Sequence, residues 1–216
     1  MSGQCCDHEA SEAQLRDTAY RRVLWAALAI NFIMFAIEIG AGLAAGSVAL
    51  QADALDFLGD TATYAISLFV IGMSLRARAL AALAKGGAMA LLGFWVAGAT
   101  VWHVAYGGAP EAFMMGAVGL AALTANAAVF VLLWRYRSGD SNMRSVWLCS
   151  RNDVIGNCAV LLAALGVFGT GTAWPDIAVA AVMSTLALQG AWAVFRQALG
   201  ELRESRLSGS AQERTA

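Results

Sequence analysis

The chain has 216 residues, of which 59% are hydrophobic and only 13% are charged, with a net charge of −1. Soluble domains carry roughly 25% charged residues, so this composition excludes an ordinary soluble globule. The near-zero net charge also shows no footprint of a nucleic-acid-binding protein.

Residues 1–22 are predicted to form a polar, cytoplasmic N-terminal tail. Its first fourteen residues contain neither a basic leader region nor a cleavage site, so no secretory signal is expected. The tail holds three groups that can bind metals, Cys5, Cys6 and His8. Two interpretations stay open: the tail captures cytosolic metal, or a short tail contains these residues by chance.

Six apolar segments follow, each about long enough to cross a hydrocarbon core of roughly 30 Å. None alternates as a membrane β-strand would, so we predict an all-α, polytopic membrane protein with six transmembrane helices over residues 23–198. Residues 199–216 are predicted to be a short cytoplasmic tail. The predicted spans are Val23–Ala45, Val48–Met73, Gly86–Val104, Ala112–Trp134, Val146–Phe168 and Ile177–Phe195.

The basic residues predict the direction of the spans. Thirteen of the fourteen fall in the two tails and in the loops after the second and fourth spans, Lys85 among them. The other three connections contain none, so both termini are expected in the cytoplasm. The exception is Arg151 in the fifth span. It either reaches toward the cytoplasm or pairs with an acid such as Asp153.

Two pairs of residues that can bind metal lie inside these spans, and the members of each pair are one helical turn apart. Asp56 and Asp60 share one face of the second helix, and Cys149 and Asp153 share one face of the fifth. A charged residue near the bilayer centre costs roughly 2.5–3.5 kcal/mol, so such acids usually have a function. At 1.5 Å per residue, Asp60 and Asp153 both lie roughly 11–12 Å from the inner boundary, so they can meet at one level.

Together these residues offer three carboxylates and one thiolate, which predicts a four-ligand site for a divalent cation. The thiolate favours Zn²⁺ or Cd²⁺, and the carboxylates keep Mn²⁺, Fe²⁺ and Co²⁺ possible. Protons compete for the same ligand atoms, so a proton gradient can expel the metal.

Other polar residues of the spans have open roles. Asp53 either lines an entrance or binds metal. Glu38 either bonds a neighbouring helix or relays protons. Asn31 and Asn157 are expected to hydrogen-bond between helices, and Asn157, one turn beyond Asp153, could also stand beside the metal.

Two segments resemble the cation diffusion facilitator family of metal transporters. In NFIMFAIEIGAGLAAGSVALQADALDFLGD, an Asn- and Glu-bearing first helix precedes the family's G-S-x-A-L-x-A-D-A segment. The second segment is SNMRSVWLCSRNDVIGN. The matching residues are Asn31, Glu38, Gly46, Ser47, Ala49, Leu50, Ala52, Asp53, Ala54, Asp56 and Asp60, then Asn142, Arg144, Asp153 and Gly156.

The resemblance covers about Leu24 to Leu199 and implies efflux of Zn²⁺-like cations from the cytoplasm in exchange for protons. No enzymatic activity and no prosthetic group are implied. Cys149 replaces the family's usual His. The tail after the last helix is short, which indicates a variety lacking the family's C-terminal domain, so any homodimer is expected to form through membrane helices.

Proteins with functions other than metal transport also place acidic residues in membrane helices. An intramembrane aspartyl protease needs G-x-G-D, whereas the sequence at Asp60 is F-L-G-D. A membrane protein that binds or senses metal without moving it stays open, as does an antiporter of organic cations and protons. The Arg- and Ala-rich composition indicates a bacterial inner membrane.

Overall fold

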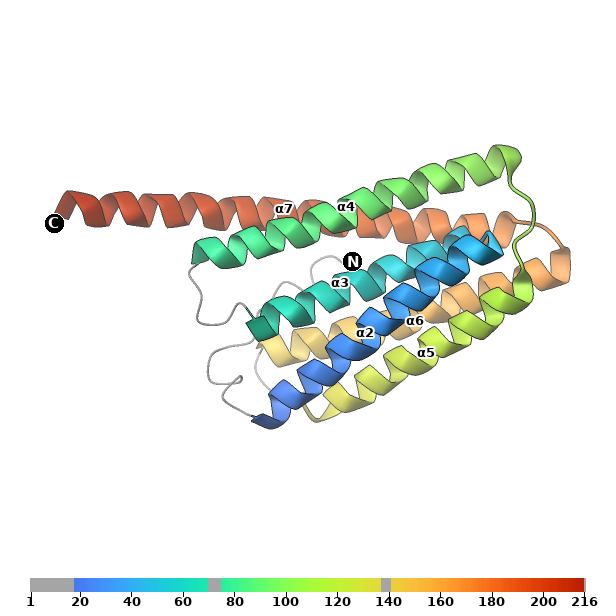
Figure 1. Ribbon diagram of the computed structural model, residues 1–216, viewed down its shortest axis with the longest axis horizontal. Coiled ribbons are helices and arrows are strands. Elements are labelled where there is room, and N and C mark those ends of the chain that lie inside the picture. Colours follow the sequence, from blue (N-terminus) through green and yellow to red (C-terminus); the bar gives the residue numbers. More distant parts are fainter. Residues whose placement is uncertain (1–17, 70–74, 137–140, 216) are drawn as a thin grey trace.

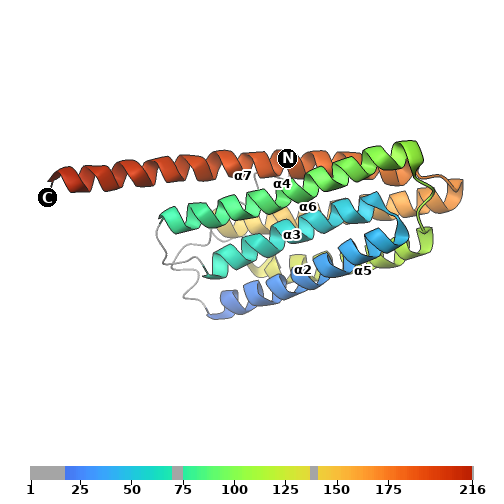
Figure 2. The ribbon, with the colours of Figure 1, turned by 45° about the horizontal axis from the view of Figure 1, so that its top comes forward.

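The computed structural model describes the backbone of residues 18–69, 75–136 and 141–215, and the side chains of residues 18–69, 76–77, 79–135 and 153–203. Within these residues, six α-helices form an elongated bundle, and the last helix extends well beyond it (Figures 1 and 2). The helices are α2 (Thr18–Ala45), α3 (Val48–Phe69), α4 (Leu75–Tyr106), α5 (Ala112–Leu133), α6 (Ser141–Thr170) and α7 (Trp174–Thr215).

Five of these helices, all except α3, are long and apolar enough to cross a membrane. Their outward faces carry large hydrophobic side chains that stay exposed in the isolated chain. Examples are Phe32 on α2, Leu91 on α4, Val131 on α5, Leu162 on α6 and Trp192 on α7. Apolar surface on this scale suits contact with lipid. The predicted all-α fold with six long helices is confirmed.

Helix α3 differs because it carries three aspartates and lies at the centre of the bundle. It packs against α2, α4, α6 and α7, and every residue from Val48 to Leu55 is buried. Backbone polar groups of a membrane helix are satisfied within the helix, but acidic side chains are not, so they must face protein or water. The central position of α3 keeps its acids away from lipid.

The start of α3 is set by a tight turn from α2. Gly46 adopts a φ of 66°, a left-handed conformation that only glycine enters without strain. One turn earlier, a Cβ on Gly42 would lie 2.9 Å from the Gln51 side chain, so only glycine allows α2 and α3 to approach this closely. Ser47 then caps α3, its hydroxyl accepting from the Leu50 N–H at 3.1 Å.

A distant carboxylate completes this cap. Asp176, at the start of α7, is fully buried. It accepts hydrogen bonds from the Ser47 hydroxyl at 2.6 Å, the Val48 N–H at 2.9 Å and the Ala49 N–H at 3.1 Å. A negative charge is favourable at a helix N-terminus, where N–H groups have no partner within the helix. Asp176 therefore fixes the start of α3 against α7.

Some predicted boundaries differ from the observed ones. The third span was expected from Gly86, but α4 begins at Leu75. The intervening residues are mostly Ala, Leu and Arg, which are strong helix formers, so the basic residues there do not mark a loop. The prediction that Lys85 lies in a loop is therefore wrong. Helix α7 likewise continues past Phe195, the predicted end of the sixth span.

Candidate metal-binding site

A cavity of about 50 Å³ lies between α3, α4, α6 and α7. It holds the three predicted aspartate ligands, Asp56, Asp60 and Asp153, together with Lys85. The rest of its wall consists of apolar or small residues, which are Gly59, Met89, Leu186, Ala187, Gly190 and Val194. Charged groups on an otherwise apolar wall, inside a membrane bundle, indicate a site for a charged ligand.

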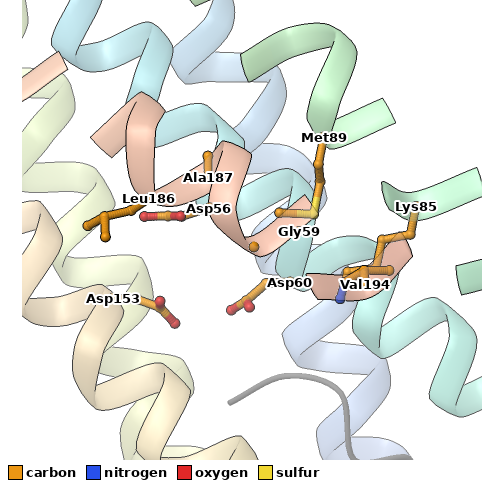
Figure 3. A pocket seen from close by; sticks show the side chains of 10 residues that line it. Asp56, Gly59, Asp60, Lys85, Met89, Asp153, Leu186, Ala187 and Val194 are labelled. Carbon is orange, nitrogen blue, oxygen red and sulfur yellow. The ribbon is translucent and has the colours of Figure 1, made fainter. Parts of the chain in front are cut away.

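The three acids reach the cavity from two helices, α3 and α6. Asp56 and Asp60 are one turn apart on α3 and reach the cavity from the same side, as their spacing predicts. Asp153 enters from α6. In Figure 3, the carboxyl groups of Asp60 and Asp153 point toward one another from these two helices. Asp60 is only 7% exposed, and the other two are half-buried.

The acids converge without closing into a metal cage. Among the residues whose side chains are described, no three His, Cys, Asp or Glu groups are close enough together to hold a metal ion. Cys149 occupies helix α6 one turn before Asp153, but its side chain lies outside the described residues. The four-ligand set therefore stays a prediction. The predictions for Arg151, Cys5, Cys6 and His8 also concern side chains outside the described residues.

A second polar cluster lies next to the site and is fully enclosed. Asn157 on α6 donates to both carboxylate oxygens of Asp53, at 3.0 and 2.8 Å, and accepts from Asn126 on α5 at 3.0 Å. The carboxyl group of Glu38 on α2 lies near that of Asp53. Glu38 and Asp53 are both 0% exposed. The cluster thus joins four helices through polar contacts.

The described contacts place the other polar residues of the spans. Asp53 is buried in the cluster and does not line the cavity. Asn157 does bond between helices, as expected. The expectation for Asn31 is wrong: its amide donates to the Ala27 carbonyl at 2.8 Å, on its own helix. A carbonyl one turn earlier is always within reach of an Asn side chain, so sequence could not separate the two cases.

The sequence analysis missed one residue of the cavity and one helix cap. Lys85 on α4 is buried and lines the cavity. Its ammonium donates to the Thr63 hydroxyl on α3 at 2.7 Å, and that hydroxyl donates to the Gly59 carbonyl at 2.8 Å. A signal for Lys85 was present, since it is the only lysine of the chain and follows an unbroken run of helix formers. Asp176 had no local signal for its capping role.

Comparisons with known proteins agree with this architecture. The chain is 28% identical over 202 residues to the zinc transporter ZitB of Escherichia coli, which covers 87% of the chain and 64% of the relative. It is 27% identical over 215 residues to ZitB of Yersinia pestis, covering 92% of the chain and 66% of the relative. The chain thus spans about two thirds of the length of these relatives, or slightly less.

A more distant relative is the cadmium, cobalt and zinc/H⁺-K⁺ antiporter of Bacillus velezensis, 23% identical over 197 residues, covering 82% of the chain and 62% of the relative. The cation efflux transmembrane domain matches residues 24–203, most of the chain and all six helices. This multi-pass membrane protein therefore belongs to the cation efflux family, which consists of transporters and not enzymes.

Proposed function

We propose that the protein exports divalent metal cations, foremost Zn²⁺, from the cytoplasm in exchange for protons. Cd²⁺, Co²⁺, Fe²⁺ and Mn²⁺ are further candidate substrates. One observation carries the proposal: Asp56, Asp60 and Asp153 from two helices line one cavity within a membrane bundle. The names of the relatives, which refer to zinc, cadmium and cobalt, support the choice of cargo.

The cavity is suited to a metal ion by its size and its charge. A volume of about 50 Å³ holds an ion with a few waters, whereas sites for drug-sized organic molecules are roughly 300–1,000 Å³. Carboxylate oxygens replace the water shell of a divalent cation and compensate its charge. The volume therefore favours a metal over an organic cation as the substrate.

Coupling to protons follows from the ligand chemistry. Carboxylates bind metal only when ionised, so each proton that binds them weakens metal binding. A proton entering from the outer side displaces the cargo, and metal entering from the cytoplasm displaces the proton. The proposed orientation places the N-terminal tail, residues 1–22, and the C-terminal tail, residues 199–216, in the cytoplasm. A homodimer through membrane helices belongs to the same proposal.

Transport by purified protein in proteoliposomes tests the proposal. With a pH gradient imposed, we expect Zn²⁺ flux in wild type and at least about a hundredfold loss in Asp60→Asn, which removes the charge but keeps the shape. A matched control is Glu201→Gln, which removes a carboxylate on α7 that is not part of the cavity. Normal Zn²⁺ flux in Asp60→Asn would refute the site.

The same vesicles separate transport from metal binding without transport. If the protein only binds or senses metal, purified wild type will bind Zn²⁺ but give no flux at any pH gradient. An organic-cation antiporter would give flux with a quaternary amine that Zn²⁺ does not inhibit. We expect neither pattern, and either one would refute proton-coupled metal export.

A further inference from the structure

Lys85 places a positive charge on the wall of a cavity that is proposed to bind a cation. The side chain is 9% exposed, and it lines the same cavity as Asp56, Asp60 and Asp153. An ammonium beside a cation-binding site repels the bound cation, and this repulsion is strong where little water is present. The presence of Lys85 in the cavity therefore needs a physical reason.

The ammonium is bound by a residue of α3, and the segment of α4 that carries it is packed against α7. Thr63 binds it at 2.7 Å from α3, and Thr63 lies three residues after Asp60, on the same helix face. On the side of α7, a Cβ added to the adjacent Gly86 would lie 3.3 Å from Val194 and 3.5 Å from the Ala191 carbonyl, so α4 is closely packed there. Thr63, which accepts from the ammonium of Lys85, thus lies about one turn from Asp60 along α3.

The charges in the cavity suggest a role for Lys85. When all three carboxylates are ionised, the described wall of the cavity has three negative groups and one positive group, a net charge of minus two that one divalent cation neutralises. Without the ammonium, the site would keep an excess negative charge after metal binding. A lysine is suited to this role because its single charge is compact. Unlike arginine, it has no planar group that can bind two carboxylates at once.

We propose that Lys85 is a tethered counter-cation that lowers the affinity of the site for divalent metal and thereby speeds metal release. When the site is empty, the ammonium partly neutralises the aspartates, so the empty carrier can return across the membrane. When metal enters, repulsion from Lys85 keeps binding weak enough for release. This inference rests on the proposed metal site, and it assigns an affinity-setting residue to that site.

Equilibrium binding of Zn²⁺ and Cd²⁺ to the full-length protein in detergent, measured by calorimetry, tests the inference. Lys85→Gln removes the charge and can still donate to Thr63, and Lys85→Met removes both the charge and the hydrogen bond. We expect both variants to lower Kd by at least about tenfold. In proteoliposomes, KM and the maximal rate should both fall, because metal binds more tightly and leaves more slowly.

Three further variants separate charge from structure. Lys85→Arg keeps the charge and should lie nearer to wild type than Lys85→Gln does. Thr63→Val removes the tether but keeps the ammonium, so it should not tighten binding. Arg135→Gln removes an exposed positive charge outside the cavity, and its Kd should match wild type.

The outcomes distinguish the two proposals. If wild type binds metal and both neutral Lys85 variants bind it with unchanged or weaker affinity, the counter-cation role is wrong while the metal site stands. Tightening in Arg135→Gln equal to that in Lys85→Gln would also overturn the role, because the effect would then be general electrostatics. Absence of metal binding in wild type and in every variant would overturn both.

Discussion

Removal of the Asp176 side chain should destabilise the protein strongly, because this carboxylate satisfies three donors in a fully buried position. Asp176→Ala leaves the Ser47 hydroxyl and the N–H groups of Val48 and Ala49 without their acceptor. A hydrogen bond to a charged group contributes about 1.5–3 kcal/mol, and a buried donor left unsatisfied costs about 1–3 kcal/mol. The three losses overlap, so we expect a total of about 3–6 kcal/mol.

Glu111 provides a matched comparison for this prediction. It also caps a helix, accepting from the N–H groups of Phe113 at 3.2 Å and Met114 at 2.7 Å, but its side chain is exposed. Water can replace an exposed cap, so Glu111→Ala should cost only about 0.5–2 kcal/mol. The contrast between the two variants isolates the effect of burial from the effect of losing a cap.

The free energy of unfolding in mixed detergent micelles, titrated with a denaturing detergent, measures both costs. Asp176→Ala should also slow metal transport, because α3 carries two of the three cavity aspartates and begins at this cap. If Asp176→Ala destabilises the protein no more than Glu111→Ala does, the carboxylate does not anchor α3 and this reasoning is wrong.

Three other predictions follow from the site and its neighbouring cluster. Cys149→Ser should shift preference away from Cd²⁺ in competition assays, and an unchanged ion profile would show that the thiol is not a ligand. Lowering the pH should weaken Zn²⁺ binding, with Kd rising about tenfold per pH unit for each proton displaced, as calorimetry in several buffers would show; a pH-independent Kd would contradict ionised carboxylate ligands. Glu38→Gln should unfold within about 1 kcal/mol of wild type, because its amide can donate to Asp53, whereas Glu38→Leu should lose about 1–3 kcal/mol; equal stabilities would mean that the Glu38–Asp53 contact does not matter.

The expected stabilities of the Glu38 variants follow from the hydrogen bonds around Glu38 and Asp53. Asp53 already accepts two bonds from Asn157, and no N–H or O–H donor in the described part of the chain reaches either oxygen of Glu38. Two neighbouring buried carboxyl groups repel when both are ionised. A glutamine at position 38 imitates the protonated acid, and a leucine does not.

Sequence patterns predicted the fold well because membrane insertion leaves few choices. Long apolar segments must form helices when no water is present to satisfy the backbone, so the number of spans and their approximate places follow from composition. The boundaries were less secure near basic residues, as α4 shows. Charge was interpreted there as a loop, although Leu75–Lys85 continues the helix and carries Lys85 into the cavity.

Part of the candidate site was also accessible from sequence. The one-turn spacing of Asp56 and Asp60 guarantees a shared face on one helix, and the estimated depths indicated that Asp153 could meet them. What spacing could not provide was the identity of the neighbours on other helices. Asp53 had the same chemistry as Asp56, yet the structure turns it toward Asn157 and Glu38.

The amino-acid sequence by itself determined that this protein is a six-helix membrane protein with acids on two of its helices, because hydropathy and helical periodicity act within a single segment. The tertiary structure alone decided which side chains share a space. Asp176 caps a helix 128 residues away, and Lys85 lines the same cavity as three aspartates, because helix packing brings together residues that no local pattern relates.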